Sequence, residues 1–327
     1  MAAMSELRNL AALEAAAALV HRVLPPTPQY RWPLLSRRVG AEIWVKHENH
    51  TPIGAFKVRG GVVYLDDLKR SRPDIKGVIT ATTGNHGQSI AYSAAALGLA
   101  ATIVVPEGNN PGKNRAMRGF GATLVETGHD FQAAYEHAAA LAEQENLHFV
   151  RSFHPLLVRG VASYALELFG VVADIDIVYV PVGLGSGICG VIAAREALGL
   201  TTEVVGVVAE NAPTYALSFA ARRPVPTNRA DTLAEGLAVR VPDPEALTII
   251  LKGAARIVTV SDAEIRQAAR AMFSDTRNLA EGAAAAPLAA ALQERARLAG
   301  KRVAIVQSGG NIERALLAEV LSEAEAE

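Results

Sequence analysis

The stretch VYVPVGLGSGICG (residues 178–190) joins an apolar strand to a loop with four glycines, and the apolar helix pattern VIAAREAL follows it. In a strand–glycine turn–helix unit, backbone N–H groups point into the turn and the helix dipole favours negative charge, so the stretch predicts an anion site. Two kinds of anion remain candidates for this site. The part GSGICG fits the G-x-G-x-x-G fingerprint of a dinucleotide site, with Glu210 at the end of the next strand. The phosphate of a smaller cofactor fits the same loop.

Outside this loop, apolar strands alternate with helical patterns, which is typical of parallel sheets with crossover helices and predicts an α/β fold. The segment 24–33 (LPPTPQYRWP) is expected to have little regular structure. The expected strands are EIWVKHE (42–48), GVITA (77–81), ATIVVPE (101–107), ATLVET (122–127), HFVRSF (148–153), DIVYVPVG (176–183), EVVGVVAE (203–210), RIVTV (256–260) and RVAIVQSGG (302–310).

Composition narrows the class of protein. The 327 residues are 50% hydrophobic and 20% charged, and 32 Lys and Arg nearly balance 33 Asp and Glu. The balance gives no indication of nucleic-acid or membrane binding. The lone Cys189 excludes an intrachain disulfide and fits a reducing compartment, and charged residues interrupt the apolar N-terminal segment 1–24, so we expect a cytoplasmic protein without a signal peptide.

The segment GAFKVRG (54–60) holds the first candidate for chemistry. Lys57 stands beside Phe56 at a strand-to-helix junction among small residues. A buried lysine there has a lowered pKa and suits a Schiff base with a carbonyl cofactor. A solvated lysine at a helix start is the alternative.

The segment TTGNHGQS (82–89) opens a helix. Its threonines supply hydroxyls, Gly84 and Gly87 permit close approach, and the N–H groups that follow suit a carboxylate, while Asn85 offers an amide to a ring oxygen. An N-cap with an Asn turn is the alternative. Near the C-terminus, QSGGN (307–311) ends a strand with a hydroxyl and a tight turn, for which a plain turn is the alternative.

Four segments, KHENHTPIGAFKVRGG, TTGNHGQS, PVGLGSGICG and QSGGN, occur in this order and resemble fold type II pyridoxal-phosphate enzymes. The nearest likeness is to the threonine/serine dehydratase and serine racemase branch, over roughly residues 20–315. It implies pyridoxal 5′-phosphate as cofactor and two open, twisted, mostly parallel sheets, as in tryptophan synthase β. It also implies a large domain (1–77 and 155–327), a small mobile domain (78–154), the cofactor between them, and a homodimer.

The resemblance also assigns roles to residues. Lys57 carries the cofactor and moves the substrate α-proton, Phe56 packs near the ring, Asn85 binds the ring oxygen and Ser308 faces the pyridine nitrogen. The glycine loop becomes a phosphate cradle, and the dinucleotide match is incidental. Its phosphate ligands are Gly183, Leu184, Gly185, Ser186 and Gly187.

The implied reaction is β-elimination. A β-hydroxy-α-amino acid of the L-threonine or L-serine type gives a 2-oxo acid and ammonia. The residues expected to bind the substrate carboxylate are Thr82, Thr83, Gly84, Asn85 and His86. Thr83 also stands where the racemases have a serine that acts as second acid/base, and its extra methyl stiffens the side chain, so we expect little racemase activity.

The chain departs from the family pattern in two places. Ala216 replaces the Asp that, six residues after Glu210, completes a cation site in many relatives, so we expect no essential metal. After His154 and Pro155, the apolar segment 156–158 replaces a longer acidic loop, which predicts an apolar pocket for a bulkier substrate such as L-threo-phenylserine. Arg159 suggests 3-hydroxyaspartate instead.

Other readings stay open at this stage. The segment 210–240 resembles dehydratases of hydroxyectoine breakdown. Serine racemase is an alternative within the branch. An NAD-linked oxidoreductase that uses GSGICG and a non-catalytic ligand-binding protein are alternatives from other classes.

Overall fold

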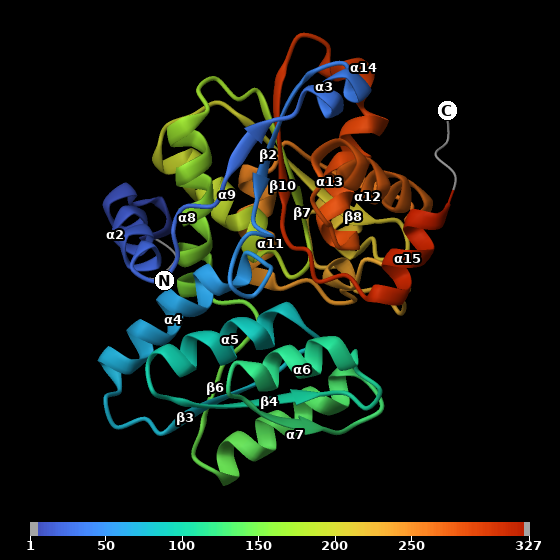
Figure 1. The fold of residues 1–327 in the computed structure, drawn as a ribbon. Coiled ribbons are helices and arrows are strands. Elements are labelled where there is room, and N and C mark those ends of the chain that lie inside the picture. Colours follow the sequence, from blue (N-terminus) through green and yellow to red (C-terminus); the bar gives the residue numbers. More distant parts are fainter. Residues whose placement is uncertain (1–5, 324–327) are drawn as a thin grey trace.

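Two sheets organise the chain, of which the computed structural model describes residues 6–323 (Figure 1). The larger sheet has the strand order β1-β2-β10-β7-β8-β9, and only β1 runs antiparallel. The smaller sheet, β5-β4-β3-β6, is parallel throughout. The predicted α/β fold with two mostly parallel sheets is confirmed. The strands are β1 (Gln29–Arg31), β2 (Glu42–His47), β3 (Gly77–Ala81), β4 (Ala100–Val105), β5 (Thr123–Glu126), β6 (His148–Phe149), β7 (Ile177–Pro181), β8 (Glu203–Ala209), β9 (Arg256–Val260) and β10 (Arg302–Gln307).

Helices cover both sheets. In the smaller layer, α5 and α7 lie on opposite sides of the strands (Figure 1). Proline stands in the first turn of α3, α6, α8 and α11, where its missing N–H leaves no bond unmade. The helices are η1 (Glu6–Arg8), α2 (Leu10–His21), α3 (Pro33–Val39), α4 (Lys57–Ser71), α5 (Asn85–Ala96), α6 (Pro111–Gly119), α7 (Phe131–Gln144), α8 (Pro155–Val171), α9 (Ser186–Ala197), α10 (Thr214–Ala221), η2 (Glu235–Leu237), α11 (Pro244–Gly253), α12 (Asp262–Thr276), α13 (Gly282–Gln293), α14 (Arg295–Leu298) and α15 (Arg314–Ser322).

Two expectations about regular structure are wrong in part. The segment 24–33 lacks helix and strand over 24–28, as expected, but Gln29–Arg31 pairs antiparallel with β2 and α3 begins at Pro33. The pairing partners are distant in sequence, and the pattern of this short segment does not show them. The strand expected at 148–153 is reduced to His148–Phe149, because only these residues pair with β3.

The parallel strands place the sequence motifs. β3 leads into Thr82, β7 into Gly183 and β10 into Ser308, so each motif follows the carboxyl end of its strand. In open α/β sheets ligands bind at these ends. The loops at these ends contact one another, as Asn85 does Asn311, and they border a cleft in which a small pocket is lined by Lys113, Glu281 and Asn311. α4 begins with Lys57 beside these loops, because its amine donates to Ser186.

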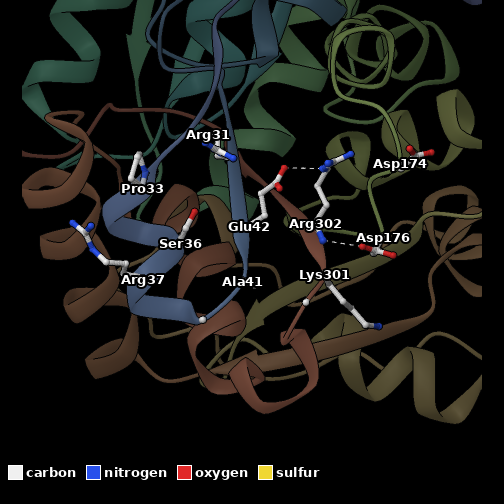
Figure 2. Close-up of a pocket in the computed structure, with 12 residues that line it drawn as sticks. Arg31, Pro33, Ser36, Arg37, Ala41, Glu42, Asp174, Asp176, Lys301 and Arg302 are labelled. Atoms are coloured by element: carbon white, nitrogen blue, oxygen red, sulfur yellow. Dashed lines mark hydrogen bonds and ion pairs between the residues drawn. The ribbon is translucent and has the colours of Figure 1, made fainter.

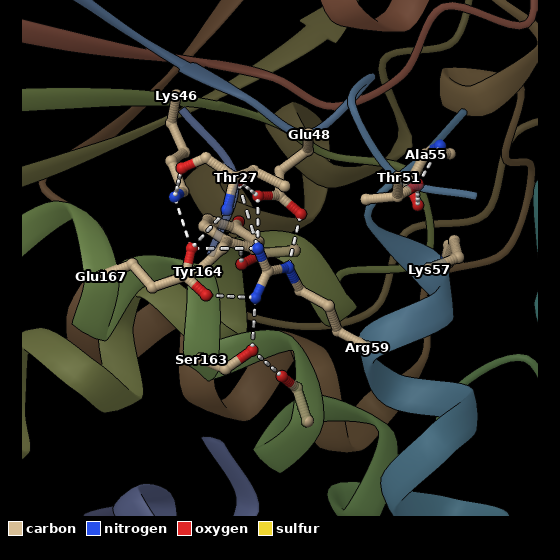
Figure 3. Close-up of polar contacts among 12 residues, drawn as sticks. Thr27, Lys46, Glu48, Thr51, Ala55, Lys57, Arg59, Ser163, Tyr164 and Glu167 are labelled. Carbon is tan, nitrogen blue, oxygen red and sulfur yellow. Dashed lines mark hydrogen bonds and ion pairs between the residues drawn. The ribbon is translucent and has the colours of Figure 1, made fainter. Parts of the chain in front are cut away.

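A buried ion network holds α4 to the larger layer (Figure 3). The Arg59 guanidinium donates to Glu48 at 2.6 Å and to Glu167 at 2.6 Å, and Lys46 also donates to Glu167. Arg59 also donates to the hydroxyls of Ser163 and Thr27 at 2.9 and 3.2 Å, and the Arg59 and Glu48 side chains have no exposed surface. Arg59 and Lys46 offset the charges of the two acids, and the His21 ring also contacts Glu167 at 2.8 Å. The network ties β2, α4 and α8 together immediately behind Lys57.

Arg59→Met is expected to lower the free energy of unfolding by about 3–5 kcal/mol, because two carboxylates then stay buried with a single base. Arg70→Met in the same helix is the matched control. Its side chain is 70% exposed and pairs with Asp66, so a loss of about 0.5 kcal/mol or less is expected. Urea unfolding of both variants measures the difference, and equal losses would contradict the role given to the network.

Candidate active site

All four motifs meet around Lys57, since the Ser89 hydroxyl of TTGNHGQS donates to the carbonyl of Lys57 at 2.7 Å. The Lys57 amine donates to the Ser186 hydroxyl at 3.0 Å and lies 5.2 Å from the centroid of the Phe56 ring. The Phe56 N–H donates to the Ser308 carbonyl at 3.0 Å. A Cβ on Gly187 would lie 3.6 Å from the same ring. Segments from three distant parts of the chain thus form one wall of the cleft.

The Lys57 amine is prepared for nucleophilic chemistry. Burial lowers its pKa from an ordinary 10.5 to about 8. Near neutral pH a useful fraction of the amine is therefore unprotonated and can attack a carbonyl. Because the next residues of α4 are fixed by the ion network, the amine is also held in place.

The glycine loop is shaped as an anion cradle. Gly185 has φ +101°, a left-handed conformation that favours glycine, and directly precedes the first residue of α9. The first N–H groups of α9 have no partner within the helix and can donate to an anion at this end. The Tyr215 hydroxyl donates to the Leu184 carbonyl at 3.0 Å, and the Tyr164 hydroxyl donates to the Gly187 carbonyl at 3.1 Å. These two bonds fix the loop from both sides.

The loop before α5 supplies the opposite wall. The Thr82 hydroxyl accepts from the Gly84 N–H at 3.1 Å, which turns the chain into the helix, and Thr83 is partly exposed. The Asn85 amide nitrogen donates to Glu281 at 2.8 Å, and its oxygen accepts from Asn311 at 2.7 Å. Asn85 therefore contacts the last residue of the QSGGN motif directly.

His86, at the start of α5, has a buried and neutral side chain. Burial lowers its pKa to about 3, so the ring carries no charge. Its ring Nε2 has no hydrogen-bond partner. In the predicted seat for a carboxylate, we expect His86 to contribute its backbone N–H.

The apolar segment after His154 does not line a pocket as expected. Pro155 starts α8, so residues 156–158 form its first turn instead of a loop. Leu157 and Val158 are 4% and 0% exposed and belong to hydrophobic clusters. A Cβ on Gly60 would lie 2.8 Å from the Leu157 carbonyl oxygen, so this turn is wedged against α4. The expectation of an apolar substrate lining from this segment is wrong for both side chains.

A separate hollow of about 840 Å³ lies at the amino ends of β2 and β10 (Figure 2). Two of its acidic residues are paired with Arg302. Arg302 donates to Glu42 at 2.7 Å through its side chain and to Asp176 at 2.7 Å through its backbone N–H. Ligands of parallel sheets bind at the carboxyl ends, so this hollow is distinct from the predicted site.

Among the described residues 6–323, no group of three or more His, Cys, Asp or Glu side chains is placed to hold a metal ion. Glu210 is exposed, and Ala216 offers no oxygen ligand from its side chain. The expected independence from metals stays a prediction. In the same residues, no helix is long and apolar enough to cross a membrane.

Comparison with known proteins identifies the family. The sequence pattern described as "Pyridoxal-phosphate dependent enzyme" matches residues 20–309. The chain belongs to this family. An L-threonine ammonia-lyase of Thermotoga maritima is 34% identical over 293 residues, which are 88% of this chain and 72% of that relative. The cofactor is therefore pyridoxal phosphate, and the NAD-linked and non-catalytic alternatives lose their basis.

Solved structures agree with this assignment. The processed form of threonine deaminase isoform 2 from Solanum lycopersicum has a TM-score of 0.90 at 28% identity, covering 96% of this chain and 92% of that chain. Maize serine racemase has a TM-score of 0.89 at 23% identity, covering 95% and 96%, and shows the fold alone. The predicted fold type II architecture is confirmed.

The residues present fit pyridoxal phosphate. The glycine cradle suits its phosphate, the Lys57 amine suits its aldehyde, and the buried Ser308 suits a ring atom that carries no fixed charge. The individual roles of these residues remain predictions. Sequence reasoning missed Glu281, because a single acid before an alanine-rich helix carries no motif. It also missed the contact that Asn311 makes with Asn85, although Asn311 lies within QSGGN.

Gly183→Ala is expected to weaken binding of pyridoxal phosphate and of inorganic phosphate by about tenfold or more. The added Cβ would lie 2.2 Å from the Gly236 carbonyl oxygen, so the cradle must shift. Gly170→Ala in α8 is the control, because its Cβ would meet no atom within 4 Å. Equilibrium dialysis with both ligands measures the change. Unchanged phosphate affinity in Gly183→Ala would place the cradle elsewhere.

Lys57→Met is expected to stabilise the cofactor-free protein below pH 8. With a folded pKa of about 8 against an ordinary 10.5, the folded protein holds its buried proton at a cost below pH 8. Between pH 8 and pH 10.5 the unfolded wild-type chain binds more protons than the folded protein. The free energy of unfolding of the wild type therefore rises with pH toward that of the variant. Urea unfolding between pH 7 and pH 10.5 tests this, and a difference that does not change with pH would contradict it.

Proposed function

We propose that this protein is a dehydratase that converts a β-hydroxy-α-amino acid of the L-threonine or L-serine type to a 2-oxo acid and ammonia. The observation that carries the proposal is the Lys57 amine, which has a pKa of about 8 and lies 3.0 Å from the hydroxyl of Ser186 in the glycine cradle. The Thermotoga maritima relative, named an L-threonine ammonia-lyase, supports the same reaction class.

Different residues of the chain bind the cofactor, bind the substrate and move the proton. The cradle 183–187 binds the phosphate and the backbone amides at 82–86 seat the substrate carboxylate, which aims the Cα–H bond at Lys57. When bound, pyridoxal phosphate supplies the electron sink for the pair left on Cα. Lys57 removes the α-proton, and the β-hydroxyl takes up a proton and leaves as water. Hydrolysis of the product by water gives the 2-oxo acid and ammonia.

Ser308 favours elimination. A hydroxyl at the ring nitrogen does not hold a proton there, as a carboxylate would, so charge on Cα is stabilised less and prompt loss of the β-hydroxyl is favoured. Phe56 is fixed through its N–H to the Ser308 carbonyl, which keeps its ring beside Lys57. Thr83 is proposed to contact substrate without acting as an efficient second base.

The domain organisation is proposed to follow the two sheets. Residues 78–154 carry the smaller sheet apart from the first residue of β3, and they would move against 1–77 and 155–327 when substrate binds. A cytoplasmic homodimer is also proposed. The buried, unpaired Cys189 supports a reducing compartment, and the family likeness supports the dimer.

Lys57→Ala is expected to fold and to lose at least roughly a thousandfold in 2-oxo acid release. Lys69→Ala in the same helix is the control, because Lys69 donates only to the Pro73 carbonyl. The substrates are L-serine, L-threonine, L-threo-phenylserine and both 3-hydroxyaspartates, with pyridoxal phosphate and no added metal. Borohydride reduction should label Lys57. Normal turnover by Lys57→Ala would overturn the assignment, and racemisation without 2-oxo acid release would favour the racemase.

A further inference from the structure

Three side chains form a hydrogen-bonded row across the cleft. The Asn85 amide nitrogen donates to Glu281 Oε1 at 2.8 Å. The Asn311 amide nitrogen donates to the Asn85 oxygen at 2.7 Å and to the Ile53 carbonyl at 2.8 Å. The row thus joins the start of α5, the residue before α13, the QSGGN turn and the segment before α4.

The direction of this row is forced by its two ends. A backbone carbonyl only accepts, so Asn311 must turn its nitrogen to Ile53, and its second N–H then points to Asn85. Asn85 must meet that N–H with its oxygen. Its nitrogen consequently faces Glu281, whose carboxylate accepts. Neither amide can be turned over without placing two acceptors or two donors face to face.

Glycines make room for the row. A Cβ on Gly54 would lie 2.7 Å from Asn311 Oδ1, and a Cβ on Gly309 would lie 2.6 Å from Glu281 Oε1. The same glycines belong to the backbone contact between the two segments, because Ala55 bridges to Gly309 and the Gly310 N–H donates to the Gly54 carbonyl at 2.9 Å. Any larger side chain at these positions would displace the row.

The charges around Glu281 suit an acceptor. Burial raises the pKa of its carboxyl and nearby Glu235 adds to this, whereas Lys113, the Asn85 amide and the Asn311 backbone N–H lower it. Lys113 is itself paired with Glu235, which offsets that repulsion. Burial outweighs these three partners, so the pKa of Glu281 is raised, and an oxygen of its carboxyl group accepts the Asn85 N–H in either protonation state.

We propose that Glu281 and Asn311 are positioning residues that lock the Asn85 carboxamide with its nitrogen presented as donor in the cleft. Glu281 uses one N–H of Asn85, and the second is directed to the ring oxygen of pyridoxal phosphate. The inference rests on the proposed contact of Asn85 with that oxygen and deepens it. Asn85 binds as a fixed donor, and its orientation is set by two residues that do not touch the cofactor.

A double-mutant cycle tests the coupling. The probe is pyridoxine 5′-phosphate, which has the same phosphate and ring oxygen but no aldehyde, so its binding does not depend on reaction with Lys57. Asn85→Ala and Glu281→Ala are each expected to weaken its binding to the cofactor-free protein by about tenfold, and the double variant no further. Inorganic phosphate should bind all three variants like the wild type. Additive losses, or loss of phosphate binding, would overturn the proposal.

Polarity reversal separates orientation from packing. Asn311→Asp keeps the size but offers only acceptors, so it turns Asn85 over and should weaken the probe about as much as Asn85→Ala does. Glu281→Gln still offers an oxygen to Asn85 and should retain most of the affinity. Wild-type affinity in Asn311→Asp, or equal losses in Glu281→Gln and Glu281→Ala, would refute the locked donor. These experiments measure binding, so their outcome does not depend on the result of the dehydratase assay.

Discussion

The burial of Arg59 is the constraint on which the site depends. A guanidinium cannot lose its charge, so an enclosed Arg59 requires carboxylates on several sides. Glu48 after β2 and Glu167 on α8 meet this requirement, with Lys46 balancing the charge. Although burial opposes it, Arg59 and Lys46 hold the pKa of Glu167 below its ordinary value. The first turn of α4 is therefore fixed by partners whose loss would leave charge buried.

This rigidity allows Lys57 to be unpaired with any acid and still be well placed. Residues two apart in a helix lie on nearly opposite sides, so Arg59 faces the network while Lys57 points away from it (Figure 3). The Lys57 amine has only a neutral hydroxyl partner in Ser186. A carboxylate beside it would keep the amine protonated, whereas burial alone leaves it reactive. The ion pairs of Arg59 thus stabilise the first turn of α4, which the burial of the unpaired Lys57 amine destabilises.

Sequence predicts those parts of the site that follow strand ends. Gly183, Thr82 and Ser308 each come after an apolar strand, and parallel pairing brings such positions together. Parts that depend on contacts between distant, unpatterned residues are not predicted. The edge strand β1 forms because it pairs with β2. Glu281 can be given a role only from its hydrogen bond with Asn85. Leu157 and Val158 show the reverse case, because their apolar character reflects packing into two hydrophobic clusters rather than contact with substrate.

The glycine loop is better explained by what surrounds it than by its own pattern. G-x-G-x-x-G is compatible with a dinucleotide, and Glu210 stands at the expected distance. Backbone and side chains pack closely against the loop, because a Cβ on Gly183 would lie 2.2 Å from the Gly236 carbonyl oxygen and one on Gly185 would lie 2.7 Å from the Ala246 side chain. Glu210 is exposed, while the loop's polar partner is Lys57 through Ser186. The neighbouring amine and the family match over residues 20–309, rather than the glycine pattern itself, therefore favour pyridoxal phosphate over a dinucleotide.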